Sequence, residues 1–314
     1  MKWERKTAAL TLCALLIVFT LTGCGRGKEQ PERQPGPARA AYTNLNDNDS
    51  RQLLQGLLSD AGVSEERVQG FFSRVEQFNG SVDAAWLTDG FEEADLLDTK
   101  YDPYEMQDMW AAKHGSFPGY NCRITAMELF GAYVSAGNDP KIHADEDVLF
   151  MDEETLKADP DALGGSSLTD FCALYSSMKA EDTTQIQRHV QTVQEEWKAR
   201  GIAFRENERM HLIAVFFHDK PTEAGSMLFI GHVGVLLTAD DGTLYFVEKV
   251  AFQEPYRLLR FASRTALSDY LMGKYDVSWG QDTAHPFILE NGELMEGWRL
   301  NADGAKAAND PDGK

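Results

Sequence analysis

Basic residues are scarce in this chain relative to acidic ones. Its 314 residues include 30 lysines and arginines against 50 aspartates and glutamates, which gives a net charge of -20. A surface of that sign repels phosphate backbones and argues against nucleic acid as a partner. The chain is long enough, and with 43% apolar residues apolar enough, to bury a core. We therefore expect a folded domain that does not bind nucleic acid.

The chain also lacks an apolar run of membrane-spanning length near its start. The run at residues 8–21 is too short to span a bilayer, follows three basic residues, and ends in Leu21-Thr22-Gly23-Cys24. We interpret residues 1–23 as a lipoprotein signal peptide and Cys24 as the lipidated residue. Residues 24–41, rich in proline, glycine and charge, predict a flexible tether. The sequence thus predicts an extracytoplasmic protein that is anchored to the bacterial cell membrane through lipid on Cys24.

Cysteines are few, and their spacing excludes a framework of disulfides or a metal site. Cys13 falls in the signal peptide and Cys24 carries the lipid, so Cys122 and Cys172 remain. The two could pair in an oxidising compartment, but neither belongs to a framework spacing, and we expect free thiols. The acidic segment at residues 143–154 lacks the alternating ligands and central glycine of a calcium loop. We expect no metal and no cofactor.

Hydrophobic periodicity predicts helices first and strands second. Helical spacing predicts helices at residues 50–58, 65–78, 103–113, from 122 onward, 152–158, 168–178, 184–199 and 265–275. Runs of β-forming residues predict strands at 211–217, 228–237, 243–250, 256–261 and 286–289. This order is typical of an α+β fold with an antiparallel sheet. We expect one domain over residues 42–300, with a helical insertion near 137–210 and a flexible tail at 301–314.

The segment GYNCRITAMELF, residues 119–130, places Cys122 between a turn and a predicted helix. A catalytic cysteine must form the thiolate, and the positive potential of a helix N-terminus favours that form. Asn121 is a favourable N-cap residue, and Arg123 adds a neighbouring positive charge. Taken alone, the segment suits equally a small buried cysteine on the apolar face of the helix, which free cysteines more often are.

A hairpin further along the chain favours the nucleophile. In GHVGVLLTADDGTLYFVEKV, residues 231–250, His232 opens one strand and Glu248 interrupts the apolar partner strand. A three-residue loop with Gly242 in the left-handed conformation places Glu248 opposite Gly234, on the same face as His232. A two-residue loop would turn Glu248 to the other face. The glycine after two aspartates favours the longer loop.

In that register the missing side chain of Gly234 would leave room for Glu248 to reach His232 diagonally. The carboxylate would orient the imidazole and stabilise its charged form, as the third group of a nucleophile–base pair does. We therefore predict a Cys122–His232–Glu248 site. For the oxyanion we expect the backbone N–H of Cys122 and a side chain from the preceding segment, with Tyr120 and Asn121 as candidates.

These residues resemble two known families. A cysteine that opens a helix, HVGVLL as a strand, and a polar residue opposite its glycine resemble the papain-like cell-wall cysteine peptidases of the NlpC type. Residues 42–298, through NCRITAMELF and HVGVLL…FVEKVAFQEPY, resemble the bacterial lipoproteins of domain-of-unknown-function family 4300. The first resemblance implies a papain-like fold with the cysteine helix packed on the sheet, and Cys122, His232 and Glu248 as nucleophile, base and orienting residue. It also implies amide hydrolysis in peptidoglycan stem peptides or another envelope peptide.

The sequence predicts a thiol hydrolase of the amidase or peptidase class. Two alternatives use the same scaffold and stay open at this point. One is a non-catalytic lipoprotein that binds a peptide or a partner, with Cys122 inert. The other is transglutaminase-like acyl transfer, which would use the same three residue types.

Overall fold

The structure is a computed structural model of the whole chain, and it describes residues 39–95, 100–137, 146–222, 225–277 and 282–301. The predicted signal peptide, Cys24, most of the predicted tether and the tail from residue 302 lie outside these described residues. The first strand begins at Arg39, so folded structure starts before the boundary predicted at Tyr42.

Eight α-helices occur among the described residues. They are α1 (Asn48–Asp60), α2 (Glu65–Asn79), α3 (Pro103–His114), α4 (Cys122–Phe130), α5 (Glu146–Ala158), α6 (Leu168–Tyr175), α7 (Ile186–Ala199) and α8 (Arg264–Tyr275). Each predicted helix is confirmed, although α6 ends at Tyr175 because the residues after it form a strand. Polar N-caps begin most of them: the side chains of Asp47, Ser64, Asp102, Asn121, Ser167 and Ser263 accept a hydrogen bond from the first turn.

The strands pair antiparallel throughout, which confirms the predicted α+β class. In the larger sheet the order is β11-β10-β6-β7-β8-β9-β1-β2, and β4 also pairs with β7. Its strands are β1 (Arg39–Thr43), β2 (Glu92–Asp95), β4 (Met178–Ala180), β6 (Met210–Thr222), β7 (Gly225–Thr238), β8 (Leu244–Lys249), β9 (Tyr256–Phe261), β10 (Phe287–Glu290) and β11 (Glu293–Leu294). A second sheet pairs β3 (Val134–Ser135) with β5 (Ala203–Phe204). The sequence patterns did not predict β1 to β5 or β11, most of which are short.

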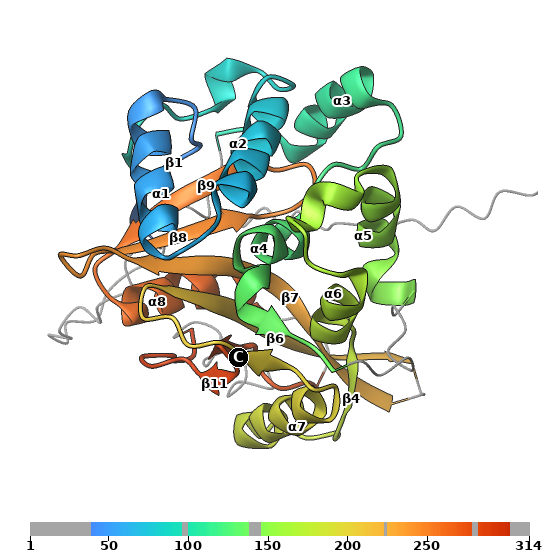
Figure 1. The fold of residues 1–314 in the computed structure, drawn as a ribbon. Helices are drawn as coiled ribbons and strands as arrows, with labels where there is room; N and C mark the ends of the chain where they lie inside the picture. Colours follow the sequence, from blue (N-terminus) through green and yellow to red (C-terminus); the bar gives the residue numbers. More distant parts are fainter. Residues whose placement is uncertain (1–38, 96–99, 138–145, 223–224, 278–281, 302–314) are drawn as a thin grey trace, which may run out of the picture. The chain divides into compact units, whose positions relative to one another are not determined.

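The large sheet separates two apolar cores. Side chains of one face pack with helices α1 to α7, and side chains of the other face pack with α8. In Figure 1, α4 lies in front of the sheet and α8 behind it. Period-two alternation along the strands supplies both cores, since Val235 faces the first and Leu236 the second.

The β7–β8 hairpin has the predicted register. Val235 pairs with Val247, as the three-residue loop requires. Gly242 has φ of +82°, in the left-handed region, and its N–H donates to the carbonyl of Ala239 at 2.9 Å. The loop therefore places Glu248 on the face of β8 that was predicted for it.

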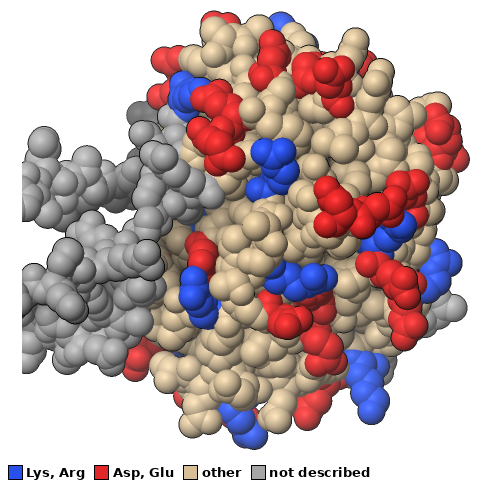
Figure 2. Space-filling view, turned by 90° about the vertical axis from the view of Figure 1, so that its left-hand side faces the viewer, with Lys and Arg blue, Asp and Glu red and all other residues tan. Residues whose placement is uncertain are grey.

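Charge is scattered on the face of the molecule drawn in Figure 2. Acidic and basic side chains interleave there among uncharged ones, and neither sign forms a single continuous patch. This face gives no indication of a binding site for a highly charged polymer.

Candidate functional site

Cys122 is the first residue of α4, where the helix dipole is positive. The N-cap is Asn121, whose side-chain oxygen accepts a hydrogen bond from the N–H of Ile124 at 3.1 Å. Gly119 introduces the turn before it with φ of +87°, and a side chain there would meet the ring of Trp110. The Cys122 side chain is buried, with 6% of the residue exposed, and the thiol is not part of a disulfide. Its place at the helix N-terminus favours the thiolate form.

A buried aspartate on α5 fixes the residues on both sides of Cys122. The amide of Asn121 donates to Asp152 Oδ1 at 2.8 Å. The guanidinium of Arg123 donates to both carboxylate oxygens, at 3.0 and 2.6 Å. Arg123 also donates to the carbonyl of Ile230 on β7 at 3.4 Å, which ties the first turn of α4 to that strand. The backbone around the thiol is therefore held from α5 and from β7.

His232 lies at a β-bulge that the sequence pattern did not predict. On β6, Val215 pairs with His232 but the next residue pairs with Ile230, so Gly231 is the extra residue. A Cβ on Gly231 would lie 2.4 Å from the ring of Phe217. The bulge changes the phase of the strand: Ile230 before it and Val233 after it both face the core that contains α4. His232 is thus the residue directly after the bulge, where the alternation of side chains between the two faces of β7 changes phase.

The side chains of His232 and Glu248 meet where β7 and β8 separate. Pairing between these strands ends at Val235 and Val247, whereas β8 continues with β9 as far as Lys249. His232 Nε2 lies 2.8 Å from Glu248 Oε2, and both residues have no exposed surface. Because an ionised carboxylate only accepts, Nε2 carries the proton of this hydrogen bond. That leaves Nδ1 as the nitrogen available to a nucleophile.

Two further residues hold Glu248 in place, and sequence analysis predicted neither. The hydroxyl of Tyr270 on α8 donates to Glu248 Oε1 at 2.6 Å. The guanidinium of Arg257 lies 3.6 Å from the same oxygen, and it donates to the hydroxyl of Tyr101 at 2.5 Å. Cys122 belongs to the core of α4 and Tyr270 to the core of α8, so His232 is flanked from opposite sides of the sheet.

The electrostatics of the three residues favour an ion pair. Burial alone would lower the pKa of His232, but the contact with Cys122, the hydrogen bond to Glu248 and the negative charges of both raise it to about 9. Burial would raise the pKa of the Cys122 thiol, but His232, helped by Arg123, lowers it below its ordinary value. Burial is likewise outweighed at Glu248, where His232 lowers the carboxyl pKa to about 2. The three groups together favour thiolate, imidazolium and carboxylate.

Nδ1 of His232 has no hydrogen-bond partner of ordinary geometry within the described part of the chain. Cys122 and His232 nevertheless shift each other's pKa, the thiol downward and the imidazole upward, which indicates that the two side chains are neighbours. The ring of Tyr275 stacks on His232, with centroids 5.1 Å apart, and shields the imidazole.

Two details of the sequence-based site are corrected. The predicted oxyanion candidates have other partners: the hydroxyl of Tyr120 donates to Asp159 at 2.8 Å, and the amide of Asn121 serves the N-cap and Asp152. The space at Gly234 does not stay open for Glu248, because a Cβ there would lie 2.3 Å from the ring of Phe246. Gly234 instead allows that ring to pack against the strand.

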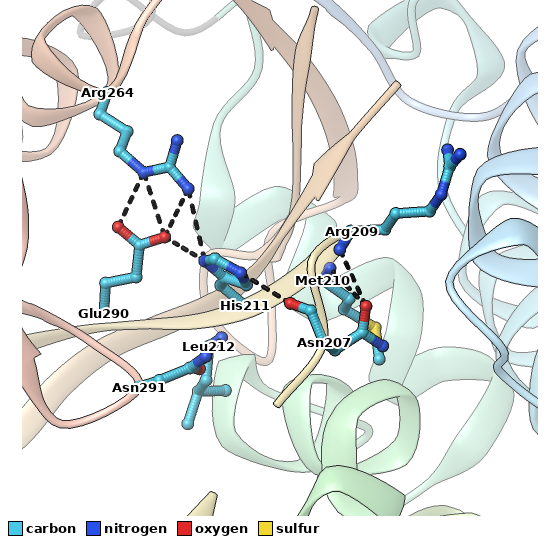
Figure 3. Close-up of polar contacts among 8 residues, drawn as sticks. All are labelled: Asn207, Arg209, Met210, His211, Leu212, Arg264, Glu290 and Asn291. Atoms are coloured by element: carbon cyan, nitrogen blue, oxygen red, sulfur yellow. Dashed lines mark hydrogen bonds and ion pairs between the residues drawn. The ribbon is translucent and has the colours of Figure 1, made fainter. Parts of the chain in front are cut away.

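Other histidines pair away from Cys122. One such cluster, on β6 and β10, is drawn in Figure 3, where His211 lies between Glu290 and the carbonyl of Asn207. Arg264 donates to Glu290 at 2.7 Å and completes the cluster. Both ring nitrogens of His211 face these partners, so neither is directed at a nucleophile. His114 contacts Ser81, and His285 contacts Asp276.

Within the described residues, no three or more histidine, cysteine, aspartate or glutamate side chains are arranged to hold a metal ion. None of the helices in that part of the chain has the length and apolarity that crossing a membrane requires.

Comparison with known proteins gives one match. Residues 41–295 match the family described as "Domain of unknown function (DUF4300)". No curated protein and no solved structure was found to match the chain.

Proposed function

The chain belongs to this DUF4300 family, and we propose that it is a lipid-anchored, extracytoplasmic thiol hydrolase that cleaves amide bonds in peptides of the bacterial cell envelope. The observation that carries the proposal is the buried His232–Glu248 pair, 2.8 Å between Nε2 and Oε2, beside a cysteine at a helix N-terminus. A nucleophile, a base and a group that orients the base are the parts that acyl transfer requires.

The residues support a two-step reaction. The Cys122 thiolate attacks the amide carbon, and the π electrons of the carbonyl move to its oxygen. Collapse of this intermediate breaks the C–N bond, while His232 gives its Nδ1 proton to the leaving nitrogen and a thioester remains. Water then attacks the thioester as His232 takes a proton from it, and C–S cleavage returns the thiolate with a carboxylic acid as product. Glu248 stays ionised and holds the ring in the productive orientation.

We also propose a papain-like architecture for the domain. The support is the order of the parts: a cysteine at the start of α4, a histidine on the central strand β7, and its partner on the antiparallel neighbour β8. The proposed location rests on sequence, namely the signal peptide at residues 1–23, Cys24 and the tether at 24–41. An amidase held there would meet peptidoglycan stem peptides as a nearby amide substrate.

Burial is the observation that favours the alternative of a non-catalytic lipoprotein that binds a peptide or partner. Cys122 is 6% exposed, and His232 and Glu248 are fully buried. A substrate carbonyl must therefore displace side chains to reach the sulfur. Acyl transfer to an amine, in the manner of transglutaminases, would share the thioester and differ only in the acceptor.

Digestion of purified peptidoglycan by the full chain tests the proposal. We expect the wild type to release new amino and carboxyl termini and Cys122→Ala to release none. Cys172→Ala is the matched control, because Cys172 is also a buried free thiol and burial raises its pKa to about 11. Cleavage that survives in Cys122→Ala, or no cleavage by the wild type, would contradict the proposal for this substrate.

A further inference from the structure

The hydroxyl of Tyr175 is a buried donor without an acceptor. Tyr175 is the last residue of α6, in the helical insertion, and is 1% exposed. Its hydroxyl has no hydrogen-bond partner among the residues that the structure describes. Buried hydroxyl groups are usually paired, because an unpaired one loses its hydrogen bonds to water and gains none in return. An unpaired donor next to a candidate site therefore invites a functional explanation.

The chain around Tyr175 is held firmly by α7. Trp197 Nε1 donates to the carbonyl of Leu174 at 3.3 Å. The guanidinium of Arg200 donates to three more backbone carbonyls, those of Ala173, Ser176 and Ser177, at 3.1, 2.8 and 2.8 Å. The backbone on both sides of Tyr175 is thus fixed, and the ring packs against Phe171 with centroids 4.9 Å apart. The hydroxyl is therefore unpaired although the backbone around it is held in place.

The topology brings Tyr175 to the strand that carries His232. Directly after α6, β4 pairs with β7, with Met178 opposite Leu228. The first turn of α4 meets the same strand two residues further on, through Arg123 and the carbonyl of Ile230. His232 follows after the bulge. The end of α6, the start of α4 and the imidazole therefore adjoin one short stretch of β7.

Burial and negatively charged groups of the candidate site raise the pKa of this hydroxyl. Burial first, and then the negative charges of Cys122 and Asp152, raise the pKa of Tyr175 well above its ordinary value. The hydroxyl therefore keeps its proton at neutral and mildly alkaline pH, and it remains a donor there.

We propose that Tyr175 is the side-chain donor of the oxyanion site: its O–H and the backbone N–H of Cys122 bind the carbonyl oxygen as this oxygen becomes negative. The N–H of the first helical residue has no acceptor within its helix, so it is free for this role. Tyr175 takes the place that the sequence suggested for Tyr120. The inference rests on the proposed function, because an oxyanion forms only if Cys122 attacks a carbonyl carbon.

Two reactions of Cys122 separate this role from the activity itself. Acylation by 4-nitrophenyl acetate passes through an oxyanion, whereas alkylation by iodoacetamide displaces iodide and forms none. Both rates are measured on the full chain for the wild type, Tyr175→Phe and Tyr256→Phe. Tyr256 is the matched control, because its hydroxyl is also buried but faces Thr125 of α4, and its ring packs against Phe71 of α2. Thermal melting verifies that each variant is folded.

For Tyr175→Phe we expect acylation to slow by roughly 100-fold or more, since that is the usual effect of removing one oxyanion donor. Alkylation should keep the wild-type rate, and Tyr256→Phe should keep both rates. Wild-type acylation by Tyr175→Phe would overturn the assignment, as would an equal loss of both rates, which would mean that the hydroxyl acts on the thiol. A wild type in which Cys122 is neither acylated nor rapidly alkylated would overturn the proposed function, and the role of Tyr175 with it.

Discussion

The imidazole of His232 lies between two groups that are negative when it is positive, the Cys122 thiolate and the Glu248 carboxylate. Burial opposes its charge, but these partners outweigh burial and raise its pKa to about 9. Because the thiol and the imidazole stabilise each other's charged forms, they titrate as a coupled pair. From the lowered pKa of Cys122 up to about pH 9, the site therefore holds thiolate and imidazolium.

Replacing Glu248 by Gln tests this balance. Loss of the negative charge disfavours the imidazolium, so the pKa of His232 should fall by about 1 unit or more. The upper limb of the pH–rate profile for acylation by 4-nitrophenyl acetate should then move from near pH 9 to lower pH. We expect the maximal rate to fall on the order of 100-fold, since a less stable imidazolium leaves less of Cys122 as thiolate and the ring is no longer oriented by a carboxylate.

Glu290→Gln is the control for that variant. It removes a carboxylate from the partly buried pair of His211 and Glu290, in which Arg264 also pairs with Glu290. The control should lose stability and leave the pH–rate profile unchanged. An unaltered upper limb in Glu248→Gln would exclude the orienting role.

At the scale of elements, α5 supports the nucleophile through one carboxylate. Asp152 is fully buried and accepts hydrogen bonds from Asn121 and Arg123, the two neighbours of Cys122. In Asp152→Asn the guanidinium of Arg123 stays buried without a counter-charge. Breaking a buried ion pair in this way costs about 3–5 kcal/mol, which thermal or denaturant unfolding would measure. If the free energy of unfolding fell by less than about 1 kcal/mol, Asp152 would not be the clamp described above.

Asp159→Asn is the comparison for this prediction. Asp159 follows α5 and pairs with Arg74, but Arg74 keeps a second carboxylate partner in Glu128. A smaller loss of stability is expected, because that guanidinium remains paired.

A second element-scale feature is the contact of two buried histidines, His189 on α7 and His218 on β6, with ring centroids 4.4 Å apart. Burial, His189 and Lys220 lower the pKa of His218 to about 4, and burial lowers that of His189. Asp182 and Asp219 act in the opposite direction on His218 without reversing the shift. Both rings are therefore neutral at pH 7.

This pair predicts a loss of stability in acid. Between the ordinary value of 6.5 and about 4, the unfolded chain binds a proton that folded His218 does not, so stability falls as pH is lowered through that window. The melting temperature of the wild type should decline across this range more steeply than that of His218→Gln. His285→Gln, which removes a partly exposed histidine that is paired with Asp276, should decline as the wild type does. Parallel curves for wild type and His218→Gln would refute the assignment.

Features that depend on local interactions could be predicted from the sequence, and features that depend on contacts between distant residues could not. The β7–β8 register followed from local turn chemistry, since Gly242 after two aspartates determines the loop and the loop determines the face of Glu248. The bulge at Gly231 had no comparable signal, because the ring of Phe217 that lies against this glycine comes from the neighbouring strand. The supports of the site were missed for the same reason: Asp152 and Tyr270 look like ordinary helix residues until the helices are packed.

At the scale of the whole molecule, the candidate site draws on distant parts of the chain. Cys122 comes from the helical half and His232 and Glu248 from the sheet half, as the predicted α+β order suggested. The helical insertion contributes α5, which holds the residues around Cys122, and α6, which ends at Tyr175. We infer that the insertion is a structural part of the site and not an appendage. The net charge of -20 concerns solubility and the exclusion of polyanions, because the site itself is buried.

The central claim is that His232 activates Cys122. The most direct test measures how fast each cysteine of the full chain reacts with iodoacetamide at pH 6.5. Peptide mass spectrometry resolves Cys122 from Cys172, which serves as the internal control because burial raises its pKa to about 11. We expect Cys122 to react about 10-fold or more faster than glutathione at this pH, and His232→Ala to lose that advantage. A Cys122 that reacts no faster than glutathione, or whose rate is the same in His232→Ala, would contradict the account.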